Sequence, residues 1–277
     1  MNYNTRPYYP TVLQLLGLFL IYIAFAIPII IAILGTFTLL DYENQSLSNM
    51  IAYTATGAFT LWYAWKKKVR LENDRKVFLF GKVNWPVYVI LIPAILSAGM
   101  FTDPVSVLIP IPDFIRNLFD TLSQNDICTF LTVCIFGPVF EELFFRGIVL
   151  NGFLKLFNPW KAIILSALFF GLFHLNPWQF FAAFIVGIVI GYVYWKTRSL
   201  LPCLYSHWLN NTLYWLLSVL VLPDKDNFSD LFPSQGWYYG IVFLSLFVLL
   251  LSFYLLRSFL ERISPGTEQE TLEVSNE

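Results

Sequence analysis

The sequence predicts an all-α polytopic membrane protein, a bundle of about eight transmembrane helices around a central polar cavity. Of its 277 residues, 57% are hydrophobic and only 13% are charged, which leaves too few charges for the surface of a soluble protein of this size. Several apolar runs approach or exceed the roughly 20 residues that cross a bilayer. Neither the net charge of −1 nor any basic aromatic cluster points to nucleic acid, so the lipid bilayer is the partner that the composition implies.

Hydropathy predicts where these spans lie. The first is long and contains Pro28, so we expect it to be tilted or broken there, and the fifth and sixth are short, so we expect one of them to be tilted or incomplete. The spans form one transmembrane bundle over residues 1–263, and the acidic tail, residues 264–277, has the composition of a disordered cytoplasmic segment. The eight predicted spans are residues 11–40, 48–65, 84–102, 127–149, 161–177, 180–195, 200–222 and 237–257.

The distribution of basic residues predicts the orientation. If both termini are cytoplasmic, 14 Lys and Arg residues lie in cytoplasmic segments, whereas Arg116 and Lys225 alone lie outside. Cytoplasmic loops of membrane proteins carry this excess of positive charge. We therefore expect an integral, multi-pass protein of the bacterial plasma membrane with both ends in the cytoplasm.

Two glutamates and an arginine lie inside the fourth predicted span, in the stretch PVFEELFFRG, residues 138–147. Each charge at the bilayer centre costs about 2.5–3.5 kcal/mol on insertion scales. Residues kept at that cost normally face a bundle interior or a water-filled cavity, and they mark a functional site by default. Glu141, Glu142 and Arg146 are therefore candidate site residues.

Helix geometry separates the roles of these three residues. At about 100° per residue, Glu142 and Arg146 share a face at spacing i, i+4 and can form an ion pair. Glu141 points roughly 100° away from Glu142, so it is the carboxylate that Arg146 neutralises least. Pro138, one turn earlier, removes a backbone donor and is expected to bend the helix. From this segment alone, a structural ion pair with an incidental second glutamate remains an alternative.

Both histidines of the chain also fall inside predicted spans. His174 ends the stretch FFGLFH, and His207 opens HWLNN, in which Asn211 lies at i+4 on the same helix face. A carboxylate and an imidazole can hold a water molecule and remove its proton. A second imidazole with a carboxamide can donate hydrogen bonds to an oxyanion. We therefore expect a hydrolase site in which Glu141 and His174 activate water while His207 and Asn211 stabilise the oxyanion.

The sequence contains none of three common catalytic motifs. It has no GxSxG nucleophile elbow, no Walker loop and no HExxH zinc motif. Cys203, four residues before His207, remains an alternative nucleophile.

Three motifs in order resemble a known signature. The stretches EELFFR (EExxxR), FGLFH (FxxxH) and HWLNN (HxxxN) are similar to those of the CAAX protease and bacteriocin-processing (ABI) family, which includes the type II CAAX prenyl endopeptidases. The resemblance covers residues about 127–222. It implies a glutamate-dependent intramembrane endopeptidase in which Glu141 and His174 activate water and His207 and Asn211 stabilise the oxyanion. Arg146 is implied to hold the conformation of its motif.

The resemblance leaves cofactor and substrate open. Glu141, His174 and His207 could ligate zinc, but the ion pair of Glu142 removes one ligand, so we favour a site without metal or other cofactor. The expected substrate is a membrane-associated or C-terminal peptide, with a prenylated CAAX-type end as one case. The cleavage position, the need for substrate lipidation and the oligomeric state do not follow from the sequence.

Two further functions stay open at this point. One is a non-catalytic membrane scaffold, regulator or immunity protein of the same fold. The other is a transporter, because intramembrane carboxylates also serve proton relays, although the sequence shows no inverted repeat.

Overall fold

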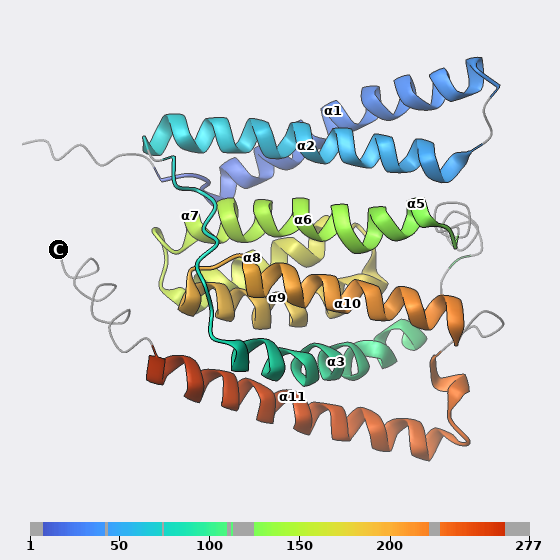
Figure 1. Ribbon diagram of the computed structural model, residues 1–277, viewed down its shortest axis with the longest axis vertical. Helices are drawn as coiled ribbons and strands as arrows, with labels where there is room; N and C mark the ends of the chain where they lie inside the picture. The colour runs from blue at the N-terminus through green and yellow to red at the C-terminus, as the bar shows by residue number, and fades with distance from the viewer. Residues whose placement is uncertain are drawn as a thin grey trace, which may run out of the picture. The chain divides into compact units, whose positions relative to one another are not determined.

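The computed structural model describes residues 8–41, 44–73, 75–109, 112, 125–221 and 228–263. Within these residues the chain is helical and has no strand, and each predicted span coincides with a helical segment (Figure 1). The all-α fold class is therefore confirmed, while the predicted tail lies outside the described residues. The segments are α1 (Val12–Leu39), α2 (Gln45–Glu72), α3 (Trp85–Leu108), one composite helix over Ile127–Phe153, α8 (Pro159–Phe173), α9 (Pro177–Thr197), α10 (Leu201–Leu220), the short η3 (Phe228–Leu231) and α11 (Gln235–Ile263).

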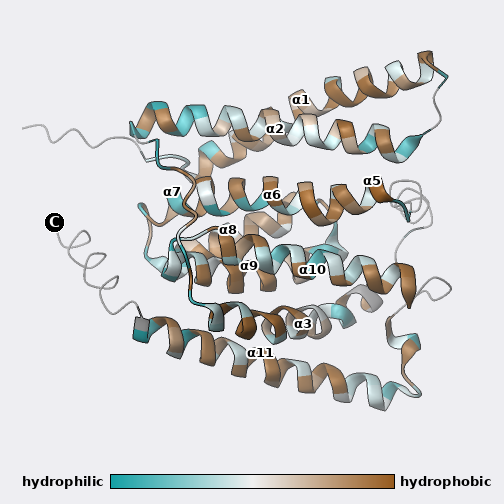
Figure 2. Cartoon of the chain, viewed as in Figure 1, coloured by the Kyte–Doolittle hydropathy of each residue, from teal (hydrophilic) through white to brown (hydrophobic). Residues whose placement is uncertain are grey.

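Five of the described helical segments are long and apolar enough to cross a membrane, namely α1, α3, the composite helix, α9 and α11. Figure 2 shows α1 and α11 as mostly hydrophobic along their length. The helices α2 and α10 are not among the five. Polar residues recur along α2, as in QSLSN and YTATG, and α10 carries HWLNN. The protein is thus an integral membrane bundle, and the number of eight spans stays a prediction.

The helices α1 and α8 correspond to the long first span and the short fifth span of the prediction. The 15 residues of α8 rise about 22 Å, which is short of the roughly 30 Å hydrocarbon core, so α8 is an incomplete span as expected. The helix α1 continues through Pro28 over 28 residues, so it is not broken there. Its length of about 42 Å exceeds the hydrocarbon core, and its tilt stays a prediction.

The chain folds into two compact units whose segments alternate along the sequence. The first unit comprises Met1–Phe78, Pro110–Asn158 and Asn211–Pro223, and the second comprises Leu79–Ile109, Pro159–Asn210 and Asp224–Glu277. The continuous helix α10 therefore begins in the second unit and ends in the first.

In the first unit, α2 packs against both α1 and the composite helix. A glycine on α2 permits this approach, because a Cβ atom at Gly57 would lie 2.9 Å from the ring of Phe140. Contacts of this kind exclude any larger residue unless the ring moves. The side chain of Phe140, the residue before Glu141, thus packs against the backbone of α2.

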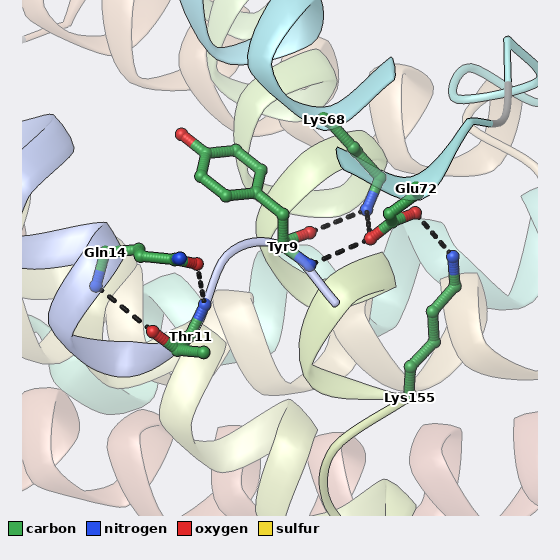
Figure 3. A network of polar contacts seen from close by, with 6 residues as sticks. All are labelled: Tyr9, Thr11, Gln14, Lys68, Glu72 and Lys155. Carbon is green, nitrogen blue, oxygen red and sulfur yellow. Dashed lines mark hydrogen bonds and ion pairs between the residues drawn. The ribbon is translucent and has the colours of Figure 1, made fainter. Parts of the chain in front are cut away.

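A buried polar network ties the start of α1 to the end of α2 (Figure 3). The backbone N–H of Tyr9 donates to Glu72 Oε1 at 2.9 Å, and Lys68 Nζ donates to the carbonyl of Tyr9 at 2.8 Å. Lys68 and Lys155 both pair with Glu72, at 3.0 and 2.6 Å. Gly152 leaves room for this segment, since a Cβ there would lie 2.5 Å from the Tyr9 carbonyl oxygen. The network therefore joins α1, α2 and the end of the composite helix.

In the second unit, α9 packs against α8 and α3, and α3 packs against α11. The small-residue stretch GIVIG on α9 makes the first of these contacts close, because a Cβ at Gly187 would lie 3.1 Å from Ala167 Cβ. Small residues at such positions let two helices approach closely. A hydrogen bond of 2.7 Å from the Tyr238 hydroxyl to Asp103 Oδ2 also joins α11 to α3.

Candidate active site

The composite helix that carries the first motif alternates between α-helical and π-helical turns. It consists of α5 (Ile127–Phe130), η1 (Leu131–Phe136), α6 (Gly137–Glu142), η2 (Leu143–Leu150) and α7 (Asn151–Phe153), of which η1 and η2 are π-helical. We expected a regular α-helix bent at Pro138, so the wider turns are a departure from the prediction. Proline removes one hydrogen-bond donor and its ring crowds the preceding turn, and a π-helical turn is one way to absorb that strain. Such turns are frequent at functional sites.

The predicted ion pair between Glu142 and Arg146 is confirmed. Arg146 Nη1 donates to Glu142 Oε1 at 2.7 Å, and the two side chains are 1% and 0% exposed. Because both charges are fully buried, each relies on the other for compensation of its lost hydration. Glu142 and Arg146 therefore lie in the interior of the first unit, where their ion pair stabilises the composite helix.

Glu141 has a different environment. Its Oε1 accepts a hydrogen bond of 3.0 Å from the hydroxyl of Tyr53 on α2, and the side chain is half-buried. Gly137 lies one turn before it, and a Cβ there would lie 3.4 Å from the Tyr53 oxygen and 3.8 Å from Glu141 Oε1. Both distances are ordinary van der Waals contacts, so Gly137 borders the phenol and the carboxylate.

Tyr53 was not among the predicted site residues. It lies 88 positions before Glu141 and belongs to none of the three motifs. One weak signal was present, since Gly57 follows Tyr53 by one helical turn and a small residue at that spacing indicates close helix packing. That signal indicates a contact without naming the partner helix.

In the second unit, Phe170 contacts both histidines. Its ring lies edge-on to His174 at a centroid distance of 5.0 Å and to His207 at 5.5 Å. His174 Nδ1 lies 2.8 Å from the carbonyl oxygen of Phe170. Because a carbonyl oxygen only accepts, this bond requires a proton on Nδ1, and the neutral ring then carries its lone pair on Nε2. The phenylalanine of the FxxxH motif therefore fixes the tautomer and the orientation of His174.

His174 lies at a chain reversal and not inside a helix. The helix α8 ends at Phe173, Leu175 adopts a left-handed φ of 51°, and Asn176 caps α9 by accepting a hydrogen bond from the N–H of Trp178. The sequence had placed His174 within a span over residues 161–177. The structure instead ends α8 one residue earlier than His174, because the left-handed residue after it and the proline at 177 both stop a helix.

His207 and Asn211 lie on one face of α10, as their spacing predicted. His207 is buried at 4% exposure. Asn211 Nδ2 donates to the backbone carbonyl of Val133 at 2.9 Å, so one of its two N–H groups serves the composite helix. A contact with this carbonyl was not expected from the sequence.

The predicted site residues thus fall into two groups. The first unit brings together Glu141, Glu142 and Arg146 on one helix, with Asn211 bonded to the same helix at Val133, about two turns before Glu141. The second unit brings together His174 and His207 around one phenylalanine ring. Approach of the two groups, and hence the pairing of Glu141 with His174, stays a prediction.

Among the described residues, no cluster of three or more His, Cys, Asp or Glu side chains has the arrangement of a metal site. The three side chains that could ligate zinc, Glu141, His174 and His207, are divided between the two units. Absence of a metal from the reaction stays a prediction.

One comparison with known proteins finds a match to a family model. Residues 123–213, about a third of the chain, match the family model described as type II CAAX prenyl endopeptidase Rce1-like. The matched range contains all six predicted site residues and agrees with the resemblance drawn from the three motifs. No curated protein and no solved structure matches the chain significantly.

Proposed function

We propose that this chain, which carries a type II CAAX prenyl endopeptidase Rce1-like domain over residues 123–213, is an intramembrane endopeptidase that uses Glu141 to activate water. The observation that carries the proposal is the division of labour between two adjacent carboxylates. Glu142 is paired with Arg146 and fully buried, whereas Glu141 is half-buried and accepts its hydrogen bond from a phenol. A phenol orients a carboxylate through a hydrogen bond and does not form an ion pair with it.

The proposed chemistry assigns one role to each residue. Glu141 takes a proton from water, and the water oxygen attacks the carbonyl carbon of the scissile peptide bond. His174 accepts a hydrogen bond from the same water through Nε2, the nitrogen that its bond to Phe170 leaves as the base. His207 and Asn211 donate hydrogen bonds to the oxyanion. The C–N bond then breaks, and the proton held by Glu141 passes to the leaving amine.

The proposed substrate is a peptide bond near the membrane, at the C-terminus or within a membrane-associated segment. A prenylated CAAX-type end is the case that the family description suggests. Intramembrane carboxylates and imidazoles give water a place to react inside a bundle. We also propose that both termini lie in the cytoplasm, in keeping with the excess of basic residues on that side.

The test is peptide cleavage by the purified protein in lipid nanodiscs. Two fluorogenic peptides of one sequence are compared, with and without a farnesyl group on the cysteine, for the wild type and Glu141→Gln. We expect kcat to fall by about 10²–10⁴-fold in the variant, the usual contribution of a general base, with an unchanged melting temperature. Full activity in Glu141→Gln would refute the mechanism.

The same experiment separates the alternatives. Addition of a chelator should leave cleavage unchanged if no metal takes part. A wild type that cleaves no peptide, with a cellular function that survives Glu141→Gln and His174→Ala, would favour the non-catalytic scaffold instead.

A further inference from the structure

A break in the backbone hydrogen bonding of the composite helix lies one turn before Glu141. The N–H of Gly137 donates to the carbonyl of Thr132, five residues earlier, which is the π-helical pattern. In an α-helix, Gly137 would instead donate to the carbonyl of Val133. In a continuing π-helical turn, residue 138 would donate to Val133, but residue 138 is proline and has no N–H. The backbone N–H of residue 137 thus bonds Thr132, and residue 138 has no N–H, so neither residue donates to the Val133 carbonyl.

The side chain of Asn211 supplies a donor at this point. Its Nδ2 lies 2.9 Å from the carbonyl oxygen of Val133, across a sequence separation of 78 residues. This bond lies at an exposed position of the helix, and lipid offers a backbone carbonyl no donor, so the bond stabilises a turn that would otherwise be unfavourable. The bond also connects α10 to the composite helix at Val133.

We propose that Asn211 is a positioning residue, which holds the π-helical turn open at Pro138 and thereby fixes the direction in which Glu141 projects. A π-helical turn inserts an additional residue, so it rotates every later side chain about the helix axis relative to a regular α-helix. Glu141 follows the turn by one helical repeat, where that rotation decides whether its carboxylate lies beside Tyr53. The Tyr53 hydrogen bond of 3.0 Å depends on this rotation.

This role is separate from the oxyanion role, because a carboxamide has two N–H donors and the Val133 bond uses one of them. The statement about Glu141 and catalysis rests on the proposed function. The statement about the turn does not, since it concerns backbone hydrogen bonds alone.

The test is a double-mutant cycle between Pro138 and Asn211, measured by thermal unfolding in detergent. Asn211→Ala should lower the melting temperature in the wild-type background. Pro138→Ala restores a backbone N–H that can bond the Val133 carbonyl, so in that background the loss caused by Asn211→Ala should be at least halved. Asn210→Ala is the matched control, because its effect should be the same in both backgrounds. Equal losses for Asn211→Ala with and without Pro138→Ala would overturn the proposal.

A second measurement tests the positioning of Glu141. If Asn211 acts through the turn, kcat of the double variant Pro138→Ala/Asn211→Ala should exceed that of Asn211→Ala several-fold, with little change in KM. Coupled melting temperatures without any recovery of kcat would overturn the positioning role while leaving the structural bond in place. If the wild type cleaves no peptide, the proposed function fails, and the melting temperatures still decide whether the bond between Asn211 and Val133 holds the turn.

Discussion

The ion pair between Glu142 and Arg146 supports a quantitative prediction, because the chain contains a matched exposed pair. Arg257 and Glu261 on α11 have the same i, i+4 spacing and a similar distance, 2.8 Å against 2.7 Å. Their side chains are 59% and 40% exposed, whereas those of Arg146 and Glu142 are 1% and 0% exposed. The two pairs therefore differ mainly in burial.

Burial sets the magnitude of the expected effect. Arg146→Met leaves the Glu142 carboxylate buried without its cation, and breaking a buried pair in this way costs about 3–5 kcal/mol. Arg257→Met breaks an exposed helical pair, which is worth about 0.3–0.5 kcal/mol. Replacing both members of the buried pair, Glu142→Leu with Arg146→Met, should recover most of the loss, because no isolated charge remains.

The assay is equilibrium unfolding in mixed micelles, followed by tryptophan fluorescence, which gives a free energy for each variant. We expect Arg146→Met to lose at least several times more stability than Arg257→Met. Losses that agree within about 0.5 kcal/mol, the usual limit of additivity, would show that the buried pair does not hold the motif helix.

Three further predictions concern other contacts of the first unit. Tyr53→Phe removes a hydrogen bond to a charged group, which is worth about 1.5–3 kcal/mol, so kcat should fall about 10- to 150-fold at unchanged KM. The control is Tyr63→Phe on the same helix. Equal kcat for both variants would contradict a role for Tyr53. Burial by itself would raise the pKa of Glu72, which lies beyond the predicted second span, but hydrogen bonds from two lysines and a backbone N–H outweigh it and hold the pKa below its ordinary value of 4.5. The stability from this network is therefore complete well above pH 4.5 and is lost as the pH falls below that value. Between about pH 6 and pH 3 the melting temperature of the wild type should fall more than that of Glu72→Gln; parallel curves would refute this. Gly152→Ala places a Cβ 2.5 Å from a backbone oxygen and should lower the free energy of unfolding by about 1–3 kcal/mol. The control is Gly17→Ala, which has nothing within 4 Å of the added Cβ and should not destabilise the protein. Equal unfolding free energies for the two variants would contradict the close contact.

Local rules predicted the parts of this protein that depend on one helix. The spacing of Glu142 and Arg146 predicted their ion pair, since residues four apart share a helix face. The same rule placed His207 and Asn211 on one face of α10.

Contacts between helices could not be predicted in this way. Nothing in the sequence around Tyr53 indicates that its hydroxyl meets a carboxylate 88 positions away. The bond from Asn211 to the carbonyl of Val133 depends on a π-helical turn, and hydropathy does not distinguish π-helical from α-helical turns. The network around Glu72 likewise joins residues from three segments that are far apart in sequence.

The sequence by itself determined that the chain is a helical membrane protein with charged residues at a defined spacing inside one span. It did so because the cost of exposing polar groups to lipid acts on each helix separately. Only the tertiary structure decided the partners that come from other helices: the phenol of Tyr53 as the donor to Glu141, and the backbone carbonyl of Val133 as the acceptor for Asn211. Those partners come from the packing of α2 and α10 against the composite helix, and packing depends on the shapes of several helices at once.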